Sequence, residues 1–369
     1  MSACLRKATN GASTATNFNK LENQYIVAGK NQNGFHLTII ILVALVLAVA
    51  GLAAWRVFRK NDQSQASTTA SQAASGQTTS KKIDKIDTAQ LKFDQSASAT
   101  DPIGDRNGPF YHDVYTATST DGVHFNPTGN KVAEHASVPD AIRLPSGQLV
   151  VYSVDGGGRS ASGVLIAVSG DNGKSWKTGS AQVSKDRLGQ AGADPQAVLT
   201  DSGQLRLYYV VFPGKPVPGQ PPSTDSVNKV YSATSADGLN FTEEQGVRFE
   251  YSQITDPDVI KIGSTWFMYA AQGQKQIYAT ATDGLSFSYK GTIRDKGSVS
   301  KTVPASGSTY RQFYCAQGIT SEISTDGITW QNPTPSLPAP VGKIICDPSP
   351  LQLDDNSWLM IYKLASANQ

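Results

Sequence analysis

The phrase STDGVHF begins at Ser119, and close variants of it recur four more times in the chain. The other copies are SGDNGKSW from Ser169, SADGLNF from Ser235, ATDGLSF from Ala281 and STDGITW from Ser324. Each copy follows an alternating apolar and polar run and ends on an aromatic residue, which predicts a strand, an Asp/Gly turn and a second strand. Self-similarity at a period of a few tens of residues indicates a repeat architecture.

A second motif precedes these hairpins and carries a DP or PD dipeptide. Its copies are VPDAIRLPSGQLVVYSV from Val138, ADPQAVLTDSGQLRLYYVV from Ala193, TDPDVIKIGSTWFMYAA from Thr255 and CDPSPLQLDDNSWLMIYKL from Cys346. A degenerate copy, SVSKTVPASGSTYRQFYCA, begins at Ser298. Two hairpins in each repeat give a four-stranded sheet of the kind that forms a propeller blade.

The order of the motifs indicates how the ring closes. The repeats begin with an unpaired outer hairpin at 111–125 and end with an unpaired inner hairpin at 347–364. If these two halves pair, they complete a fifth blade and leave no bare strand edge. We therefore expect an all-β fold, a five-bladed β-propeller over residues 101–369 in which N- and C-terminal halves share one blade.

Two features of the repeats resemble known families. SGDNGKSW is similar to the Asp box of sialidases, and the DP or PD dipeptide resembles the five-bladed glycosidases that include arabinanases, xylosidases and fructosidases. The resemblance covers roughly the last 270 of the 369 residues. It implies a propeller and a glycoside hydrolase that uses paired carboxylates without a cofactor. A calcium ion would suit an oxygen-rich central funnel, although the sequence has no dedicated calcium loop.

The N-terminal third has a different composition. Residues 1–36 form a tail, and residues 37–55 (LTIIILVALVLAVAGLAAW) are nineteen residues without a charge. That length spans a hydrocarbon core of about 30 Å, so it predicts a single transmembrane helix. Residues 56–100 are rich in Ser, Thr, Gln and Ala, which predicts a disordered linker. A buried helix or a cleaved signal peptide is the alternative for residues 37–55.

Flanking charges do not orient this segment, because basic residues lie on both sides of it. The linker composition favours a stalk, which would hold the propeller outside the cytoplasm at a cell membrane. Cys315 and Cys346 lie in adjacent repeats, either as a disulfide or as two separate thiols. The net charge of +2, without a basic stripe, argues against a nucleic-acid partner. Only four histidines and no zinc motif are present, so we expect no metal site of that kind.

Alignment of the repeats on the proline places polar residues in two columns. The first column is Val138, Asp194, Asp256 and Asp347, and the second is Asp140, Gln196, Asp258 and Ser349. Residues two apart on a strand share a face, so both columns can face the central funnel. Glycosidases need two carboxyl groups. An Asp before Pro also caps turns, which is the structural alternative for Asp194, Asp256 and Asp347.

Glu322 interrupts another column, because four repeats have alanine at its position. A carboxylate in a packed strand needs a partner or a cavity. We therefore predict Asp140, Asp258 and Glu322 as catalytic residues with Glu322 as the general acid, or Glu322 as a salt-bridged edge residue. Predicted binding residues are Asp194, Asp256, Asp347, Arg143 and Arg311. Sialidase chemistry needs a cluster of arginines to bind the substrate carboxylate. Because the arginines of this chain fall in different columns, we rank sialidase chemistry below furanosidase or xylosidase chemistry.

Two classes of function follow. The first is a membrane-anchored glycoside hydrolase that acts on a glycan or polysaccharide outside the cell. The second is a propeller that binds a glycan or a protein without catalysis. The five Asp-box aspartates are expected to hold turns rather than to act in either site.

Overall fold

The computed structural model describes residues 82–184, 193–213 and 226–367. The predicted tail, the predicted transmembrane helix at 37–55 and the linker up to residue 81 lie outside the described residues. Within the described ranges, no helix is long and apolar enough to cross a membrane.

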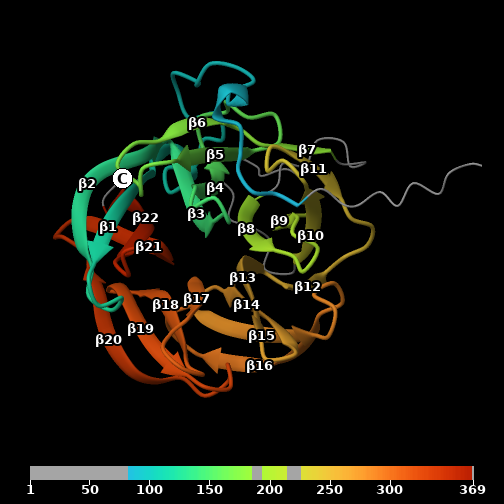
Figure 1. Cartoon of the computed structure of the whole chain (residues 1–369), viewed down its shortest axis with the longest axis vertical. Helices are drawn as coiled ribbons and strands as arrows, with labels where there is room; N and C mark the ends of the chain where they lie inside the picture. Colours follow the sequence, from blue (N-terminus) through green and yellow to red (C-terminus); the bar gives the residue numbers. More distant parts are fainter. Residues whose placement is uncertain (1–81, 185–192, 214–225, 368–369) are drawn as a thin grey trace, which may run out of the picture. The chain divides into compact units, whose positions relative to one another are not determined.

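Five sheets surround a common axis, and each contains four antiparallel strands (Figure 1). Blade 1 contains β3 (Ala136–Arg143), β4 (Leu149–Asp155), β5 (Val164–Ser169) and β6 (Lys177–Ser180). Blade 2 contains β8 (Ala193–Leu199), β9 (Leu205–Val211), β10 (Val227–Ser235) and β11 (Asn240–Glu243), with β7 (Gln182–Ser184) on β11 and β12 (Phe249–Ser252) on β10. Blade 3 contains β13 (Ile254–Ile262), β14 (Thr265–Gln272), β15 (Lys275–Ala281) and β16 (Ser288–Arg294). Blade 4 contains β17 (Ser300–Pro304), β18 (Tyr310–Ala316), β19 (Gly318–Ser324) and β20 (Gln331–Pro338).

Blade 5 closes the ring as the sequence predicted. It joins β21 (Lys343–Gln352) and β22 (Trp358–Ser366) to β1 (Asp113–Ser119) and β2 (Asn126–Glu134). β1 pairs with β22 without a register shift, from Asp113 opposite Leu364 to Ser119 opposite Trp358. The innermost strands β3, β8, β13, β17 and β21 contact one another in a closed ring. The five-bladed propeller is therefore confirmed.

The core lies between blades, where alternate residues of each strand face the neighbouring sheet. One repeated contact uses a buried tyrosine. The hydroxyl groups of Tyr152, Tyr208 and Tyr269 donate hydrogen bonds of 2.8, 2.7 and 2.7 Å to glycine carbonyls in the next blade. Those glycines lie in the Asp-box turns, so the repeated phrase is also a docking point between sheets.

The Asp-box aspartates hold their own turns, as predicted. Asp121 Oδ1 accepts backbone N–H bonds from Val123 and His124 at 2.8 Å, and Asp326 accepts the equivalent pair at 2.8 and 2.7 Å. These bonds favour the ionised form and lower the pKa of Asp326 to about 2. Their role is structural because the bonds fix the turn.

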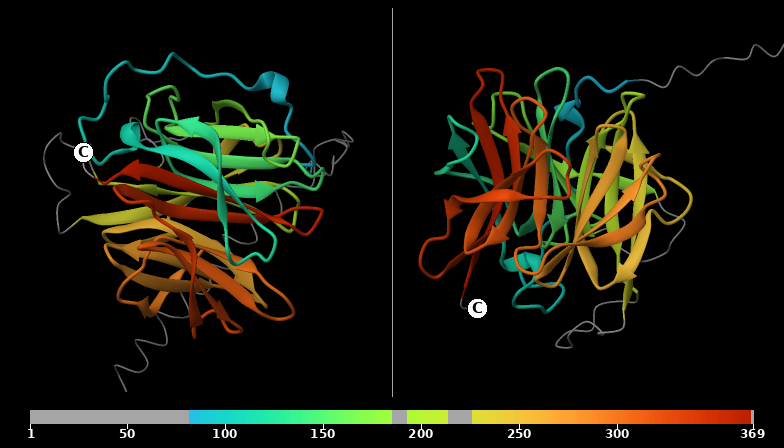
Figure 2. Two further views of the ribbon diagram at one scale, coloured as in Figure 1. Left: turned by 90° about the vertical axis from the view of Figure 1, so that its left-hand side faces the viewer. Right: turned by 90° about the horizontal axis from the view of Figure 1, so that it is seen from below.

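Residues 82–112, here called the strap, differ from the predicted linker. The compact unit that contains the propeller begins at Thr78, so the described part of that linker, residues 82–100, belongs to the propeller unit. Ile83 and Ile86 are 3% and 1% exposed in the core between blades 1 and 2. The strap has two short 3₁₀ turns, η1 (Thr88–Gln90) and η2 (Pro109–Tyr111), and runs along the green blades in Figure 2. The polar composition of this segment predicted disorder, but its two buried isoleucines supply enough apolar surface to pack on the propeller.

Candidate functional site

The DP and PD motifs form a bulge at the start of four inner strands. Val138, Asp194, Asp256 and Asp347 have φ values of 49°, 51°, 50° and 53°, in the left-handed region. The strand register shifts just after each of them. Such a conformation is costly for residues other than glycine, so contacts around it must stabilise it. The bulge turns these residues toward the axis of the ring.

The four bulges surround a cavity on the propeller axis, here called the axial cavity. Its lining includes Asp140, Asp194, Gln196, Asp256 and Asp347. Its volume is about 20 Å³. That space holds about one water molecule. Two oxygens in its lining, Asp347 Oδ1 and Gln196 Oε1, are buried and have no hydrogen-bond partner among the described residues.

First-column aspartates bond the backbone of the next blade. Asp347 Oδ2 of blade 5 accepts from the Val138 N–H of blade 1 at 3.1 Å. Asp194 Oδ2 of blade 2 accepts from the Asp256 N–H of blade 3 at 3.2 Å. Asp347 also pairs with Lys363 at 2.9 Å. These contacts fit the structural alternative for the column.

Residues of the second column, two positions further along each inner strand, also bond the neighbouring blade. Asp140 Oδ2 accepts from the Ala197 N–H at 2.8 Å, which joins blade 1 to blade 2. Ser349 accepts from the Ala141 N–H at 2.8 Å, and Gln196 donates to the Val259 carbonyl at 3.2 Å. Polar side chains of the motif thus connect neighbouring inner strands around the ring.

Asp258 joins blade 3 to blade 4 through side chains instead. Its Oδ2 accepts from the Thr302 and Ser300 hydroxyls at 2.7 and 3.1 Å. Its Oδ1 is buried and has no partner among the described residues. Burial raises the pKa of Asp258 above its ordinary value, although the hydroxyl bonds oppose that shift.

Lys301 is a residue of this site that sequence reasoning missed. Its ammonium group bonds Asp140 Oδ1, so it connects blade 4 directly to blade 1 across the ring. Both side chains are almost fully buried. The signal in the sequence is the degenerate repeat, where SVSKTVP carries a lysine near the second column. The positive charge of Lys301 balances the negative charge of the buried Asp140 carboxylate.

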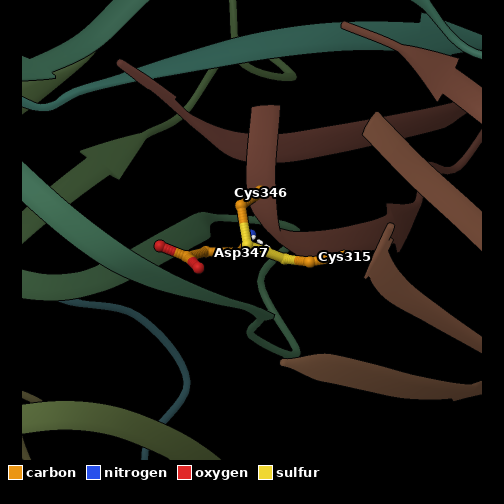
Figure 3. A group of neighbouring side chains, drawn as sticks. All are labelled: Cys315, Cys346 and Asp347. Atoms are coloured by element: carbon orange, nitrogen blue, oxygen red, sulfur yellow. Dashed lines mark hydrogen bonds between the residues drawn. A yellow bond between two sulfur atoms is a disulfide. The ribbon is translucent and has the colours of Figure 1, made fainter. Parts of the chain in front are cut away.

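A disulfide joins blade 4 to blade 5. Cys315 on β18 is bonded to Cys346 on β21, with a Cα–Cα distance of 5.0 Å, and Figure 3 shows the bond beside Asp347. The Asp347 N–H also donates to Cys315 Sγ at 3.1 Å. Of the sequence alternatives, the disulfide is therefore the observed one. Because the two sulfurs bond each other, this cluster is no metal site in the oxidised chain.

Glu322 lies on β19, the third strand of blade 4, and does not line the axial cavity. Its carboxylate pairs with Arg294 of blade 3 at 2.8 Å and accepts from the Tyr314 hydroxyl at 3.0 Å. Arg294 also donates to Gln312 at 2.8 Å. Where the other repeats pack alanine, blades 3 and 4 are thus joined by a salt bridge. This is the alternative that the sequence left open for Glu322, and its catalytic role stays a prediction.

The two predicted binding arginines lie away from the axial cavity. Arg143 pairs with Asp354 at the far end of β3, and Arg311 donates to the Ser321 hydroxyl at 3.0 Å within blade 4. Neither lines the axial cavity. The structure therefore does not bring them to Asp194, Asp256 and Asp347.

Asp194, Asp256 and Asp347 form a charged cluster with Lys363 at the axial cavity. Burial, with the Asp347 charge nearby, raises the pKa of Asp194 to about 6. Burial and the carboxylates of Asp194 and Asp347 raise the pKa of Asp256 well above its ordinary value. Burial opposes the charge on Lys363, but Asp347 and the other carboxylates raise its pKa overall. The cluster therefore holds protons at pH values where free carboxyl groups are ionised.

His112 lies beside this cluster, and sequence reasoning missed it as it missed Lys301 and Lys363. Its Nδ1 is 2.9 Å from the Ser137 hydroxyl. Burial and the nearby Lys363 charge lower the pKa of His112 to about 4, so it is neutral at physiological pH. The cavity lining offers oxygen ligands for a cation, but Lys363 already neutralises part of its charge. The suggestion of calcium stays a prediction.

No family model and no curated protein matches the sequence. Several solved structures are similar at low identity. A protein of unknown function from Dyadobacter fermentans is 13% identical with a TM-score of 0.48, over 68% of this chain and 83% of that one. A GH43 protein from Bacillus licheniformis is 12% identical with a TM-score of 0.49, over 63% of this chain and 49% of that one. The α-L-arabinanase of Penicillium chrysogenum is 11% identical with a TM-score of 0.45, over 69% of this chain and 98% of that one. The chain spans about half the length of the Bacillus protein.

Proposed function

We propose that this chain is a carbohydrate-binding propeller whose axial carboxylates hold the ring together instead of hydrolysing glycosides. The observation that carries the proposal is the set of bonds between blades. Asp140, Asp258 and Glu322 each bond a neighbouring blade. The carbohydrate class rests on the resemblance of the repeats to those of five-bladed glycosidases.

The axial cavity supports the same proposal by its size. A glycosidase places two carboxyl groups about 5 to 9.5 Å apart with the sugar between them. Pockets for small molecules have volumes of roughly 300 to 1,000 Å³. The axial cavity, at about 20 Å³, is far smaller. A sugar ring does not fit there while the inner strands keep these positions.

The test measures hydrolysis and binding on the same preparation. The full chain, purified in detergent, is assayed against chromogenic arabinosides, xylosides, galactosides and fructosides, and its binding is measured on a glycan array. We expect glycan binding without hydrolysis. Turnover that Asp140→Asn abolishes, and that the exposed control Asp84→Asn preserves, would overturn the proposal.

One observation favours a second candidate, a glycoside hydrolase that uses Asp194 and Asp256. Burial raises the pKa of both carboxyl groups, and a carboxyl group that keeps its proton near neutral pH can act as a general acid. This candidate requires the inner strands to move apart, because a sugar ring does not fit the axial cavity while they keep their positions. In that case the same assay detects turnover, and Asp256→Asn removes it while Asp140→Asn retains part of it.

We also propose that the propeller lies outside the cytoplasm, anchored through residues 37–55. The support is the Cys315–Cys346 disulfide, because such bonds persist in oxidising compartments. Ser308, in the exposed turn between β17 and β18, provides the test. Ser308→Cys, in a full chain that also carries Cys4→Ser so that no thiol remains on the other side of the anchor, should react with a membrane-impermeant maleimide on intact cells. Reaction only after lysis would place the propeller inside.

A further inference from the structure

A cavity of about 260 Å³ lies off the axis, between blade 5 and blade 1, and is here called the lateral cavity. Blade 5 contributes β2 to its wall, blade 1 contributes β4 and β5, and the strap covers one side. The residues used below are Phe93, Val132, Ser153, Arg159, Leu165 and Ala167. Its volume approaches the roughly 300 Å³ at which small-molecule pockets begin.

At one position of the repeat that lines this cavity, blade 1 has smaller side chains than blades 2 and 5. Blades 2 and 5 place a cross-strand tyrosine pair there, Tyr209 with Tyr231 and Tyr115 with Tyr362. The rings of each pair lie 6.5 Å apart. Blade 1 has Ser153 opposite Leu165 at the same position. Blade 1 therefore lacks the two aromatic rings that occupy this position in blades 2 and 5.

The lateral cavity contains a side-chain hydroxyl group that a ligand can reach. Ser153 is 3% exposed, and its hydroxyl makes no hydrogen bond within the described residues. It lines the cavity on the face of β4 that packs toward blade 5. The oxygen is not among the buried side-chain atoms that lack a partner, so it is accessible from the cavity. A bound hydroxyl group or a water molecule can therefore pair with it there.

The two cations around the cavity already have partners. Arg159, 7% exposed, donates to Asp155 at 3.1 Å and to the Glu134 carbonyl at 2.7 Å. Its guanidinium lies 5.1 Å from the centre of the Phe93 ring. Lys131 at the rim pairs with Asp113 at 2.8 Å. With both cations paired, the cavity favours a neutral ligand over an anion.

The geometry points to one neutral sugar unit of a glycan as the ligand of the lateral cavity. Val132, Leu165 and Ala167 supply an apolar wall for a ring face, and Ser153 supplies a hydrogen-bonding group for a hydroxyl. The volume suits a single ring and is too small for a longer chain. This inference rests on the proposed carbohydrate-binding function, because it assigns the position of the binding site.

The equivalent residue of blade 2 suggests a substitution that would fill the lateral cavity. Ser153→Tyr places in blade 1 the residue that blade 2 has at the same position, Tyr209. The matched control is Ser308→Tyr, because Ser308 is exposed in a turn of blade 4. Titration of the full chain in detergent uses the methyl glycosides of arabinose, xylose, galactose and fructose as probes. Circular dichroism and thermal unfolding verify that each variant is folded, and Ser153→Leu replaces Ser153→Tyr if the larger side chain prevents folding.

We expect at least one probe to bind the wild type, Ser153→Tyr to weaken that binding by about tenfold or more, and Ser308→Tyr to leave it unchanged. Equal binding by the wild type and Ser153→Tyr would overturn the lateral site and leave the proposed function intact. If no probe and no arrayed glycan binds the wild type, both the site and the carbohydrate-binding function are overturned.

Discussion

The inner-strand carboxylates illustrate how one residue type takes two roles according to its partner. Asp140 faces a backbone N–H and a lysine, whereas Asp256 faces two other carboxylates. In the first case burial still raises the pKa of Asp140 above its ordinary value, although Lys301 and the hydrogen bonds oppose that shift. In the second case burial and repulsion both favour the protonated form.

Asp256→Asn should reduce the pH dependence of stability. An ordinary Asp has a pKa of about 3.9 when unfolded. The folded-state pKa values of Asp194, about 6, and of Asp256 are raised. Between about pH 4 and 6 the folded chain therefore binds more protons than the unfolded chain, and stability falls as pH rises through that window.

We expect Asp256→Asn to stabilise the propeller at pH 7.5 by on the order of 1 to 3 kcal/mol, with a smaller gain at pH 5. Thermal unfolding at both pH values measures this difference. Asp84→Asn, on the exposed strap, is the control. Equal changes in Tm at the two pH values would contradict the assignment of raised pKa values.

Lys301→Met should destabilise the ring strongly, because it leaves the buried Asp140 carboxylate without its opposite charge. Breaking one side of a buried ion pair costs about 3 to 5 kcal/mol. The double substitution Asp140→Asn with Lys301→Met should recover much of that loss. Urea unfolding of the three proteins gives the comparison. A neutral effect of Lys301→Met alone would show that the pair does not stabilise the fold.

Among the elements, β17 differs most from its counterparts. It lacks the bulge and the DP dipeptide, and its register with β18 is regular. Polar bonds from the motif join the other neighbouring inner strands, whereas the disulfide joins blade 4 to blade 5. The covalent bond therefore lies where the repeated hydrogen bonds are missing.

Replacing both cysteines, as Cys315→Ser with Cys346→Ser, should lower the free energy of unfolding by about 2 to 4 kcal/mol. The two residues are 31 positions apart, so the bond closes a loop of moderate length. Urea unfolding measures the change, and Cys4→Ser serves as the control. Unfolding free energies that do not differ between the double variant and the control would argue that the bond contributes little.

The strap is an element that depends on two apolar side chains. Ile86→Ala removes a side chain that is 1% exposed between blades 1 and 2. Such a deletion costs about 2 to 5 kcal/mol. Val341→Ala, at a fully exposed position, should change stability by less than about 0.5 kcal/mol. If both substitutions have the same small effect, the strap does not contribute to the core.

At the scale of the whole molecule, the ring depends on the pairing of β1 with β22. A chain that ends at Gly342 lacks β21 and β22 and leaves β1 and β2 as an isolated hairpin with a bare edge. Two-stranded hairpins are marginally stable, and bare edges pair with other chains. We expect this truncated chain to lose cooperative thermal unfolding and to aggregate. A chain that ends at Ser366 should unfold like the wild type, and cooperative unfolding of both chains would contradict the closure argument.

The sequence predicted the blades and their closure because these depend on local signals. Asp and Gly in the turns and alternating apolar residues in the strands act within one hairpin. It also aligned the first-column residues that line the axial cavity, since the proline marks their position, but it did not identify Lys301. It did not identify the strap, because Ile83 and Ile86 are two apolar residues in a polar stretch.

The role of the axial residues was decided only by the tertiary structure. Val138 and Asp347 are 209 residues apart, and Asp140 and Lys301 are 161 apart. A carboxylate that bonds the next blade and one that faces a substrate have the same local sequence, so the repeat pattern does not distinguish them. The lateral cavity has the same origin, because the volume left beside Ser153 depends on strands from two blades and on the strap. The sequence by itself determined the ring, and the packing of its blades determined which side chains remain available to a ligand.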